Sequence, residues 1–170
     1  MAESGWDFSS RWLRSPTDLK TVAISDIIPS DLNTLMGLTE TYLIPLCIKY
    51  QRSDLTQYYK SLLSSRKQYF NEIFTSVSYP DTTPFQKLKE AIYPSDFYPY
   101  LLFSETATSI PSIYTNTVNP TSSIYATGEQ WDRPNVWAPN NWILHEVTGL
   151  KDGFRFAQEW VSTTYCSWKK

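Results

Sequence analysis

Large apolar residues recur at helical spacing over Asp54–Phe74, and this pattern constrains the fold of the chain more than any other. Its leucine, tyrosine, phenylalanine and isoleucine residues fall three or four positions apart, while most of its charged residues lie on the opposite side. Asp54 has the side chain of a helix N-cap. The segment is therefore predicted to be an amphipathic helix that packs along one face.

Other parts of the chain repeat this helical pattern, and none shows the polar–apolar alternation of a half-buried strand. A helix is predicted over Asp31–Tyr50, with Ser30 or Asp31 as N-cap and a kink at Pro45. Its core-facing stripe is predicted to hold Leu32, Leu35, Met36, Tyr42, Leu43, Leu46 and Tyr50. Further helices are predicted over Phe85–Ile92, Pro99–Ala107, Asn140–Gly149 and Asp152–Trp168. The fold is thus predicted to be all-α, with paired helices and long loops.

Composition limits the partners and the chemistry. The 170 residues suffice for one domain with a core, and the formal net charge of -2, with both signs interspersed, argues against nucleic acid or an anionic membrane as partner. No apolar run is long enough for a transmembrane helix. Cys47 and Cys166 are too few for a disulfide framework and are expected to be buried thiols. His145 is the single histidine, which excludes a multi-histidine metal site; His145 is expected to be structural.

The stretch Gln130–Pro139, QWDRPNVWAP, combines two tryptophans with two prolines and short polar side chains. The prolines predict a rigid loop or a helix start, because they fix the backbone and remove hydrogen-bond donors. Indole rings cover the apolar faces of a sugar, while carboxylate and carboxamide groups bind its hydroxyls. The residues therefore suit a sugar site, with a tryptophan-rich packing corner between helices as the alternative.

A second stretch, Glu3–Trp12, reads ESGWDFSSRW. Together the two stretches resemble signatures of the trehalases, glycoside hydrolases that split α,α-trehalose into two glucose molecules. The first resembles the segment that holds the catalytic acid, and QWDRPNVWAP resembles the second trehalase signature. Ile27–Asn33 (IIPSDLN) and Ala126–Glu129 (ATGE) also resemble the family.

The resemblance implies that residues 1–170 form a single partial catalytic domain, an internal fragment of about half of an (α/α)6 toroid with long motif-bearing loops. It implies an inverting acid/base hydrolysis of α,α-trehalose that needs no cofactor and no metal. The expected partners are the small-molecule substrate and the missing halves of the same catalytic domain.

In this resemblance Asp7 falls at the position of the general acid. Apolar surroundings raise the pKa of a carboxyl group, and Trp6, Phe8 and Trp12 are expected to supply them. Arg11, four residues further on, could instead pair with Asp7 and hold it ionised. Asp7 could also serve as the N-cap of a helix over Phe8–Leu13.

The resemblance and the side-chain chemistry together give four substrate-binding candidates. Gly5 lies where the family lines its sugar site, and as a glycine it permits close backbone approach or an unusual φ. Trp131 is the candidate stacking platform, and Gln130 and Asp132 are the candidates for binding hydroxyls; Asp132 could instead cap the turn before Pro134. Two further tryptophans, Trp137 and Trp142, are expected in the core.

The family's general base is a glutamate in a glycine-rich segment, and no such segment occurs between Gln130 and Lys170. None of Glu129, Glu146 and Glu159 has that context, so none is assigned as base. The isolated chain is therefore expected to be inactive, and its alternatives are a non-catalytic disaccharide-binding protein or a helical interaction module.

Overall fold

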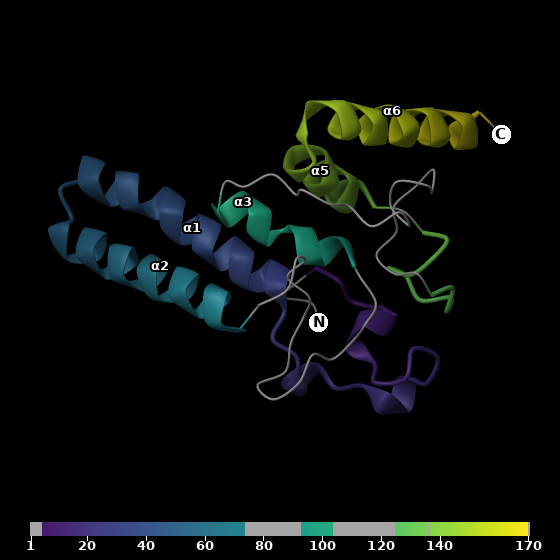
Figure 1. The fold of residues 1–170 in the computed structure, drawn as a ribbon, viewed down its shortest axis with the longest axis horizontal. Coiled ribbons are helices and arrows are strands. Elements are labelled where there is room, and N and C mark those ends of the chain that lie inside the picture. The colour runs from purple at the N-terminus through teal and green to yellow at the C-terminus, as the bar shows by residue number, and fades with distance from the viewer. Residues whose placement is uncertain (1–4, 74–92, 104–124, 136, 170) are drawn as a thin grey trace.

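The structure, a computed structural model, describes residues 5–73, 93–103, 125–135 and 137–169 (Figure 1). Within these ranges the chain forms helices and loops and no strand, with one isolated bridge between Leu13 and Val22. The α-helices are α1 (Ser30–Lys49), α2 (Ser53–Ile73), α3 (Pro99–Phe103), α5 (Ala138–Val147) and α6 (Gly149–Trp168). Short 3₁₀ helices are η2 (Ser10–Trp12), η3 (Leu19–Thr21), η4 (Ile24–Asp26) and η5 (Pro94–Phe97). The all-α prediction is confirmed, and the helix pairs are the kind of unit that an (α/α)6 toroid repeats.

The first pair, α1 and α2, is an antiparallel hairpin, with α3 beside α1 (Figure 1). A buried polar network joins the two helices, because the Arg66 guanidinium on α2 binds the Glu40 carboxylate on α1 at 2.7 Å and the Asn33 carboxamide oxygen at 3.0 Å. Gly37 permits close packing here, since a Cβ atom on it would lie 2.8 Å from the Leu102 side chain of α3. The contact face of α1 is therefore made largely of small and polar residues.

This face corrects the predicted apolar stripe of α1. The residues buried on α1 are Ser30, Asp31, Thr34, Gly37, Glu40 and Cys47. Most of the predicted stripe is exposed instead, namely Leu35, Met36, Tyr42, Leu46 and Tyr50. The guanidinium of Arg66 and that of Arg11, described below, bind carboxylates on the polar face, and this pairing outweighs the apolar pattern of the helix.

The helix ends also differ in part from their predictions. The N-cap of α1 is Pro29, without a side-chain cap, and the predicted N-caps Ser30 and Asp31 lie inside the first turn instead. The helix continues through Pro45. The predicted helix Phe85–Ile92 lies outside the described residues, as does the end of Pro99–Ala107. Cys47 is buried as expected, whereas Cys166 is exposed on α6.

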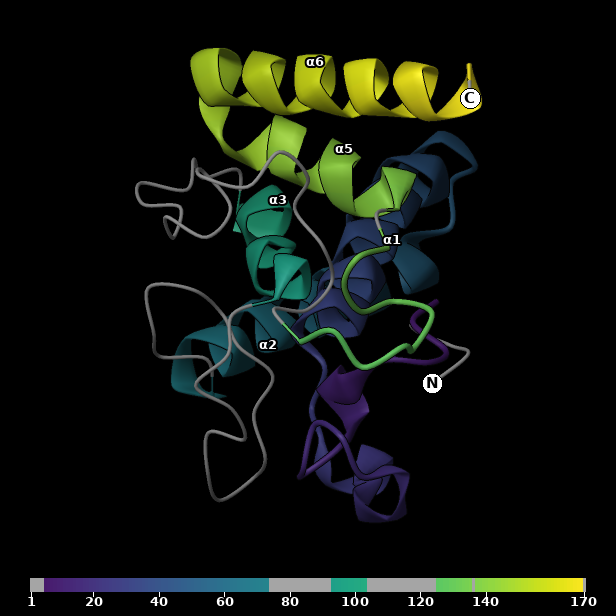
Figure 2. The same ribbon diagram turned by 90° about the vertical axis from the view of Figure 1, so that its right-hand side faces the viewer.

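The second pair, α5 and α6, packs at close range (Figure 2). A Cβ atom on Gly153 of α6 would lie 2.5 Å from the His145 carbonyl oxygen of α5, so only glycine fits there. The main apolar core lies between this pair, η5 and α3, and contains Phe97, Tyr98, Tyr100, Ile143, Leu144, Val147 and Phe156. This core holds the helix that follows the second motif in place. His145 and Trp142 are both exposed, so the prediction of Trp142 as a core residue is wrong.

Gly153→Ala is expected to lower the free energy of unfolding by about 1–3 kcal/mol, because the added methyl group meets backbone that cannot yield without shifting α5. Urea denaturation followed by tryptophan fluorescence measures the change. Ser162→Ala, on an exposed position of the same helix, is the control and should unfold like the unchanged chain. Equal stability of the two variants would contradict the close approach of the helices.

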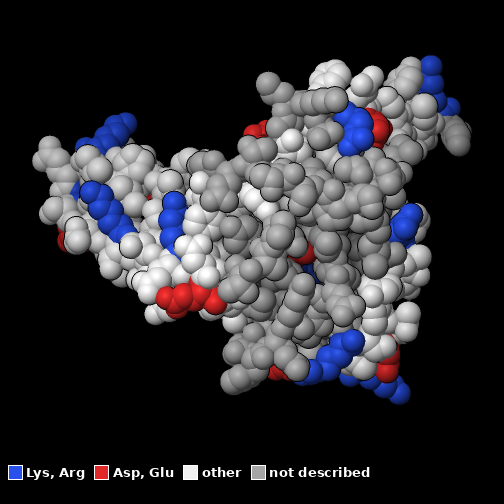
Figure 3. All heavy atoms as spheres, viewed as in Figure 1, with Lys and Arg blue, Asp and Glu red and all other residues white. Residues whose placement is uncertain are grey.

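The surface of the described residues combines scattered charge with exposed apolar side chains. Positive and negative side chains are interspersed on the face seen in Figure 3. No helix in the described part of the chain is long and apolar enough to cross a membrane. Exposed large apolar residues occur on α1 and on α6, where they include Phe154, Val161, Tyr165 and Trp168.

Candidate active site

The two sequence motifs lie against each other, although more than a hundred residues separate them. The Trp131 amide donates to the Phe8 carbonyl oxygen at 2.8 Å. The Asp132 carboxylate accepts from the Ser10 amide and from the Ser9 hydroxyl, both at 2.8 Å. Figure 2 shows the loop that carries Trp131 beside the N-terminal segment. The proximity that the motifs require for a common site is therefore present.

Planar side chains from both motifs stack on one another at this contact. The Arg11 guanidinium lies 4.7 Å from the ring centroid of Trp6 and 4.6 Å from that of Trp12. Trp6 in turn stacks on Trp131 with centroids 5.3 Å apart, and Trp131 stacks on Trp137 at 4.7 Å. Cation–π and aromatic contacts of this kind fix ring positions beyond what burial alone does. Trp6, the residue before Asp7, is thereby fixed in position by contacts with residues of both motifs.

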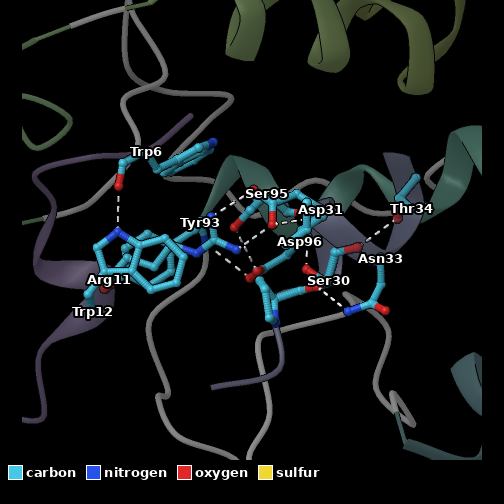
Figure 4. Close-up of polar contacts among 12 residues, drawn as sticks. Trp6, Arg11, Trp12, Ser30, Asp31, Asn33, Thr34, Tyr93, Ser95 and Asp96 are labelled. Atoms are coloured by element: carbon cyan, nitrogen blue, oxygen red, sulfur yellow. Dashed lines mark hydrogen bonds and ion pairs between the residues drawn. The ribbon is translucent and has the colours of Figure 1, made fainter. Parts of the chain in front are cut away.

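Arg11 does not pair with Asp7, which resolves one alternative raised by the sequence. Its two terminal nitrogens bind the two Asp31 carboxylate oxygens at 2.7 and 2.6 Å (Figure 4). The side chains are 0% and 1% exposed, so this is a fully buried bidentate ion pair. Asp31 lies in the first turn of α1, where the helix dipole favours a carboxylate. The ion pair thus attaches the first motif to the start of α1.

Asp7 itself is half-buried, and its carboxylate differs from the others nearby. In the described part of the chain it forms no hydrogen bond and no ion pair with another side chain or with the backbone. The N-cap of η2 is Ser9, whose hydroxyl accepts from the Arg11 amide, so the expectation that Asp7 caps this helix is wrong. Of the three aromatic residues expected to supply apolar surroundings, Phe8 is exposed, whereas Trp6 and Trp12 are buried.

Gly5 and Gln130 lie on the exposed side of the contact between the motifs. Gly5 has φ +78°, in the left-handed region that favours glycine, which is one of the two alternatives raised for this position. No atom lies within 4 Å of where its Cβ would be, so open space adjoins this position. The Gln130 side chain is exposed, while its carbonyl accepts from the Trp137 indole at 2.9 Å. Both residues are placed where a ligand can reach them.

Trp131 and Asp132 lie deeper. Trp131 is 9% exposed, with its ring packed against Trp6 and Trp137. Asp132 is 0% exposed, and its carboxylate also accepts from the Thr127 hydroxyl at 2.6 Å. These two residues therefore connect the motifs from the inside, and their roles toward a substrate stay predictions.

The charges of the buried ion pair affect the pKa of Tyr98, a core residue of the segment between the motifs. Burial raises the pKa of the Tyr98 hydroxyl well above its ordinary value, the Asp31 carboxylate raises it further, and Arg11 opposes this. Tyr98 is therefore neutral at physiological pH.

Among the described residues, no group of three or more His, Cys, Asp or Glu side chains gathers as metal ligands would.

The sequence identified Asp31 and Arg11 as members of motif-like segments but missed their pairing. The available signal was their chemistry, since an arginine between two tryptophans and an aspartate at a helix start both need partners when buried. The two residues are 20 positions apart, with the 3₁₀ helices η3 and η4 between them, and no local spacing rule covers that distance.

Comparison with known proteins adds independent evidence. A family model described as Trehalase matches residues 1–170. The "Trehalase" of Dictyostelium discoideum is 32% identical over 200 residues, which cover 98% of this chain and 33% of that protein. The "Periplasmic trehalase" of Xanthomonas campestris is 31% identical, covering 96% of this chain and 29% of the relative, and that of Pseudomonas aeruginosa is 30% identical, covering 88% and 29%. The chain thus spans about a third of the length of the curated relatives it matches.

Proposed function

We propose, because this chain belongs to the trehalase family, that its two motifs form part of a site that hydrolyses α,α-trehalose to two glucose molecules. One observation carries the proposal for the site. Asp7 has a carboxylate without a protein partner among the described residues, on a backbone segment that is bound on several sides. A general acid that donates a proton to a ligand needs a fixed position and carboxyl oxygens that are not bound by protein donors.

The proposed chemistry is general acid catalysis with inversion. Asp7 gives its proton to the oxygen that bridges the two glucose units, and the bond from that oxygen to the anomeric carbon breaks. A water molecule attacks the same carbon from the opposite face, and a second carboxylate takes its proton. In inverting glycosidases the two carboxyl groups stand about 6.5–9.5 Å apart, which leaves room for that water.

We assign no residue of this chain as the second carboxylate. Among the described residues, each buried carboxylate is bound by protein donors: Asp31 by Arg11, Glu40 by Arg66, Asp96 by the Tyr93 amide, and Asp132 by Ser9 and Ser10. A carboxylate held this way is a poor base, because its oxygens are bound by protein donors and are not placed to take a proton from water. The base is therefore expected from the glycine-rich segment that the family resemblance implies.

For the substrate we propose a division between the four candidates. Gly5 and Gln130 are exposed and contact the sugar directly, Gln130 through its carboxamide. Trp131 contacts the sugar with the small part of its ring that is exposed, and it stacks on Trp6, the residue before Asp7. Asp132 is buried, and its carboxylate binds Ser9 and Ser10 of the first motif.

The exposed apolar side chains suggest where other parts of the same catalytic domain pack. Several of them lie on α1 and on α6. Apolar surface that is left exposed in this way marks association surfaces. The relatives are about three times longer than their match to this chain, which leaves ample sequence for such elements. We therefore propose that further helices of the domain cover these faces.

The proposed function is tested with a chimera in which this chain replaces the matching third of the Dictyostelium trehalase. Glucose release from α,α-trehalose is the expected result, with the unmodified relative as positive control. A chimera that folds and binds α,α-trehalose but releases no glucose would favour the non-catalytic disaccharide-binding alternative. A folded chimera that neither binds nor cleaves it would contradict both readings.

A further inference from the structure

We propose that Asp132 is a positioning residue that fixes the backbone carrying Asp7. It sets where the acid stands, and it makes no contact with the sugar. This inference rests on the proposed function, because it concerns the placement of the proposed general acid. It goes beyond that function by giving a separate role to a residue of the second motif.

The burial and the bonding of Asp132 argue against a direct contact with the substrate. The residue is 0% exposed, and three donors converge on its carboxylate. Oδ1 accepts from the Ser9 hydroxyl at 2.8 Å, and Oδ2 accepts from the Ser10 amide at 2.8 Å and the Thr127 hydroxyl at 2.6 Å. A sugar hydroxyl could reach this carboxylate only by displacing charge-assisted hydrogen bonds inside the protein.

The donors that Asp132 binds come directly after Asp7 in the chain. Ser9 is the N-cap of η2, and its hydroxyl also accepts from the Arg11 amide at 3.1 Å. Just before Asp132, the Trp131 amide donates to the Phe8 carbonyl oxygen. Residues 131 and 132 thus bind residues 8, 9 and 10, and the contacts form an unbroken set beside Asp7.

A second set of contacts, in which Asp132 takes no part, holds the same segment. Arg11 is tied to Asp31 at the start of α1, and Trp6 stacks on Trp131. With residues 6 and 8–11 all bound, the Asp7 backbone has little freedom while its carboxylate is left for a ligand. A displacement of about 1 Å at a catalytic group can cost about 100-fold in rate, so losing one of these restraints should be visible in turnover.

Two substitutions of Asp132 show whether its hydrogen bonds to the first motif set the position of Asp7. Asp132→Asn has the same shape and keeps one oxygen for the Ser10 amide and the Thr127 hydroxyl, while its amide group can donate to the Ser9 hydroxyl. Asp132→Ala removes all three acceptor contacts, including the one that accepts from the buried Ser10 amide. The Asn variant should therefore rescue the position of Asp7, and the Ala variant should lose it.

The test uses the full chain, labelled with 13C at aspartate carboxyl groups, and follows the Asp7 resonance identified by its loss in Asp7→Asn. We expect Asp132→Ala to shift and broaden this resonance and to speed amide exchange at residues 6–10 at least 10-fold, with Asp132→Asn close to the unchanged chain. Thr127→Val, which removes one of the three bonds, should give a smaller change in the same direction and serves if the Ala variant fails to fold.

Glu40→Ala is the matched control, because it also removes a buried carboxylate bound by several donors, on the far hairpin. It should lower stability without moving the Asp7 resonance. The inference is overturned if Thr127→Val and Asp132→Ala leave that resonance unchanged, or if Glu40→Ala moves it equally. These readouts need no turnover, so they stay decisive if the chimera releases no glucose; where it does, Asp132→Ala should lower kcat about 100-fold with KM changed little.

Discussion

Asp7→Asn is expected to lower the rate of glucose release from α,α-trehalose by about 10²–10⁴-fold. Asparagine has the shape of aspartate but no proton to give to the bridging oxygen. The carboxylate makes no hydrogen bond or ion pair with the described residues that the substitution would break, so the free energy of unfolding should stay nearly constant. Steady-state glucose release by the chimera measures the rate, and calorimetry measures α,α-trehalose binding, which should change little.

The control for Asp7→Asn is Asp26→Asn, which changes an exposed carboxylate paired with Arg14 at the surface. That variant should keep the full rate. If Asp7→Asn also kept it, Asp7 would not be the acid. If instead it unfolded the protein, the carboxylate would have a structural role that its surroundings do not show.

Arg11→Met is expected to lower the free energy of unfolding by about 3–5 kcal/mol. Methionine replaces the aliphatic part of the side chain but leaves the Asp31 carboxylate, 1% exposed, without its cationic partner. The contacts of the guanidinium with Trp6 and Trp12 are lost as well. Urea denaturation of the whole chain measures the change.

Two further variants show whether the buried charge is the cause. Arg14→Met breaks a solvent-exposed ion pair with Asp26 and should cost less than about 1 kcal/mol. Arg11→Met combined with Asp31→Leu removes both buried charges, and it should recover part of the stability that Arg11→Met loses. A cost below about 1 kcal/mol for Arg11→Met would contradict the buried ion pair.

The sequence predicted the positions of α1 and α2 correctly, but it did not predict which face of α1 is buried. The prediction Asp54–Phe74 matches α2 (Ser53–Ile73), and Asp31–Tyr50 matches α1 (Ser30–Lys49), because long periodic segments carry a strong local signal. The buried side of α1 was missed, since Glu40 is buried only through a partner on another helix. Hydrophobic periodicity cannot anticipate a helix whose contacts are made through buried ion pairs.

In the candidate site too, the sequence predicted local features but not the contacts between distant residues. The motifs identified the segments that meet, and the glycine of the first motif adopts an unusual φ, one of the two alternatives raised for it. The sequence left open whether Arg11 binds Asp7, and only the folded chain shows that it binds Asp31. Likewise, the sequence did not indicate that Ser10 and Ser9, 122 and 123 residues away, donate to the Asp132 carboxylate. Such pairings depend on the packing of the helices, which no motif encodes.

Hydrolysis of α-glucosyl fluoride tests most directly whether the Asp7 proton goes to the departing oxygen. Fluoride leaves without being protonated, so a missing acid should matter little for this substrate, whereas the bridging oxygen of α,α-trehalose needs the proton. Measured in the chimera, Asp7→Asn should keep the fluoride rate within about 10-fold of the unchanged protein while the α,α-trehalose rate falls by about 10²–10⁴-fold. Equal losses on both substrates would contradict Asp7 as the proton donor.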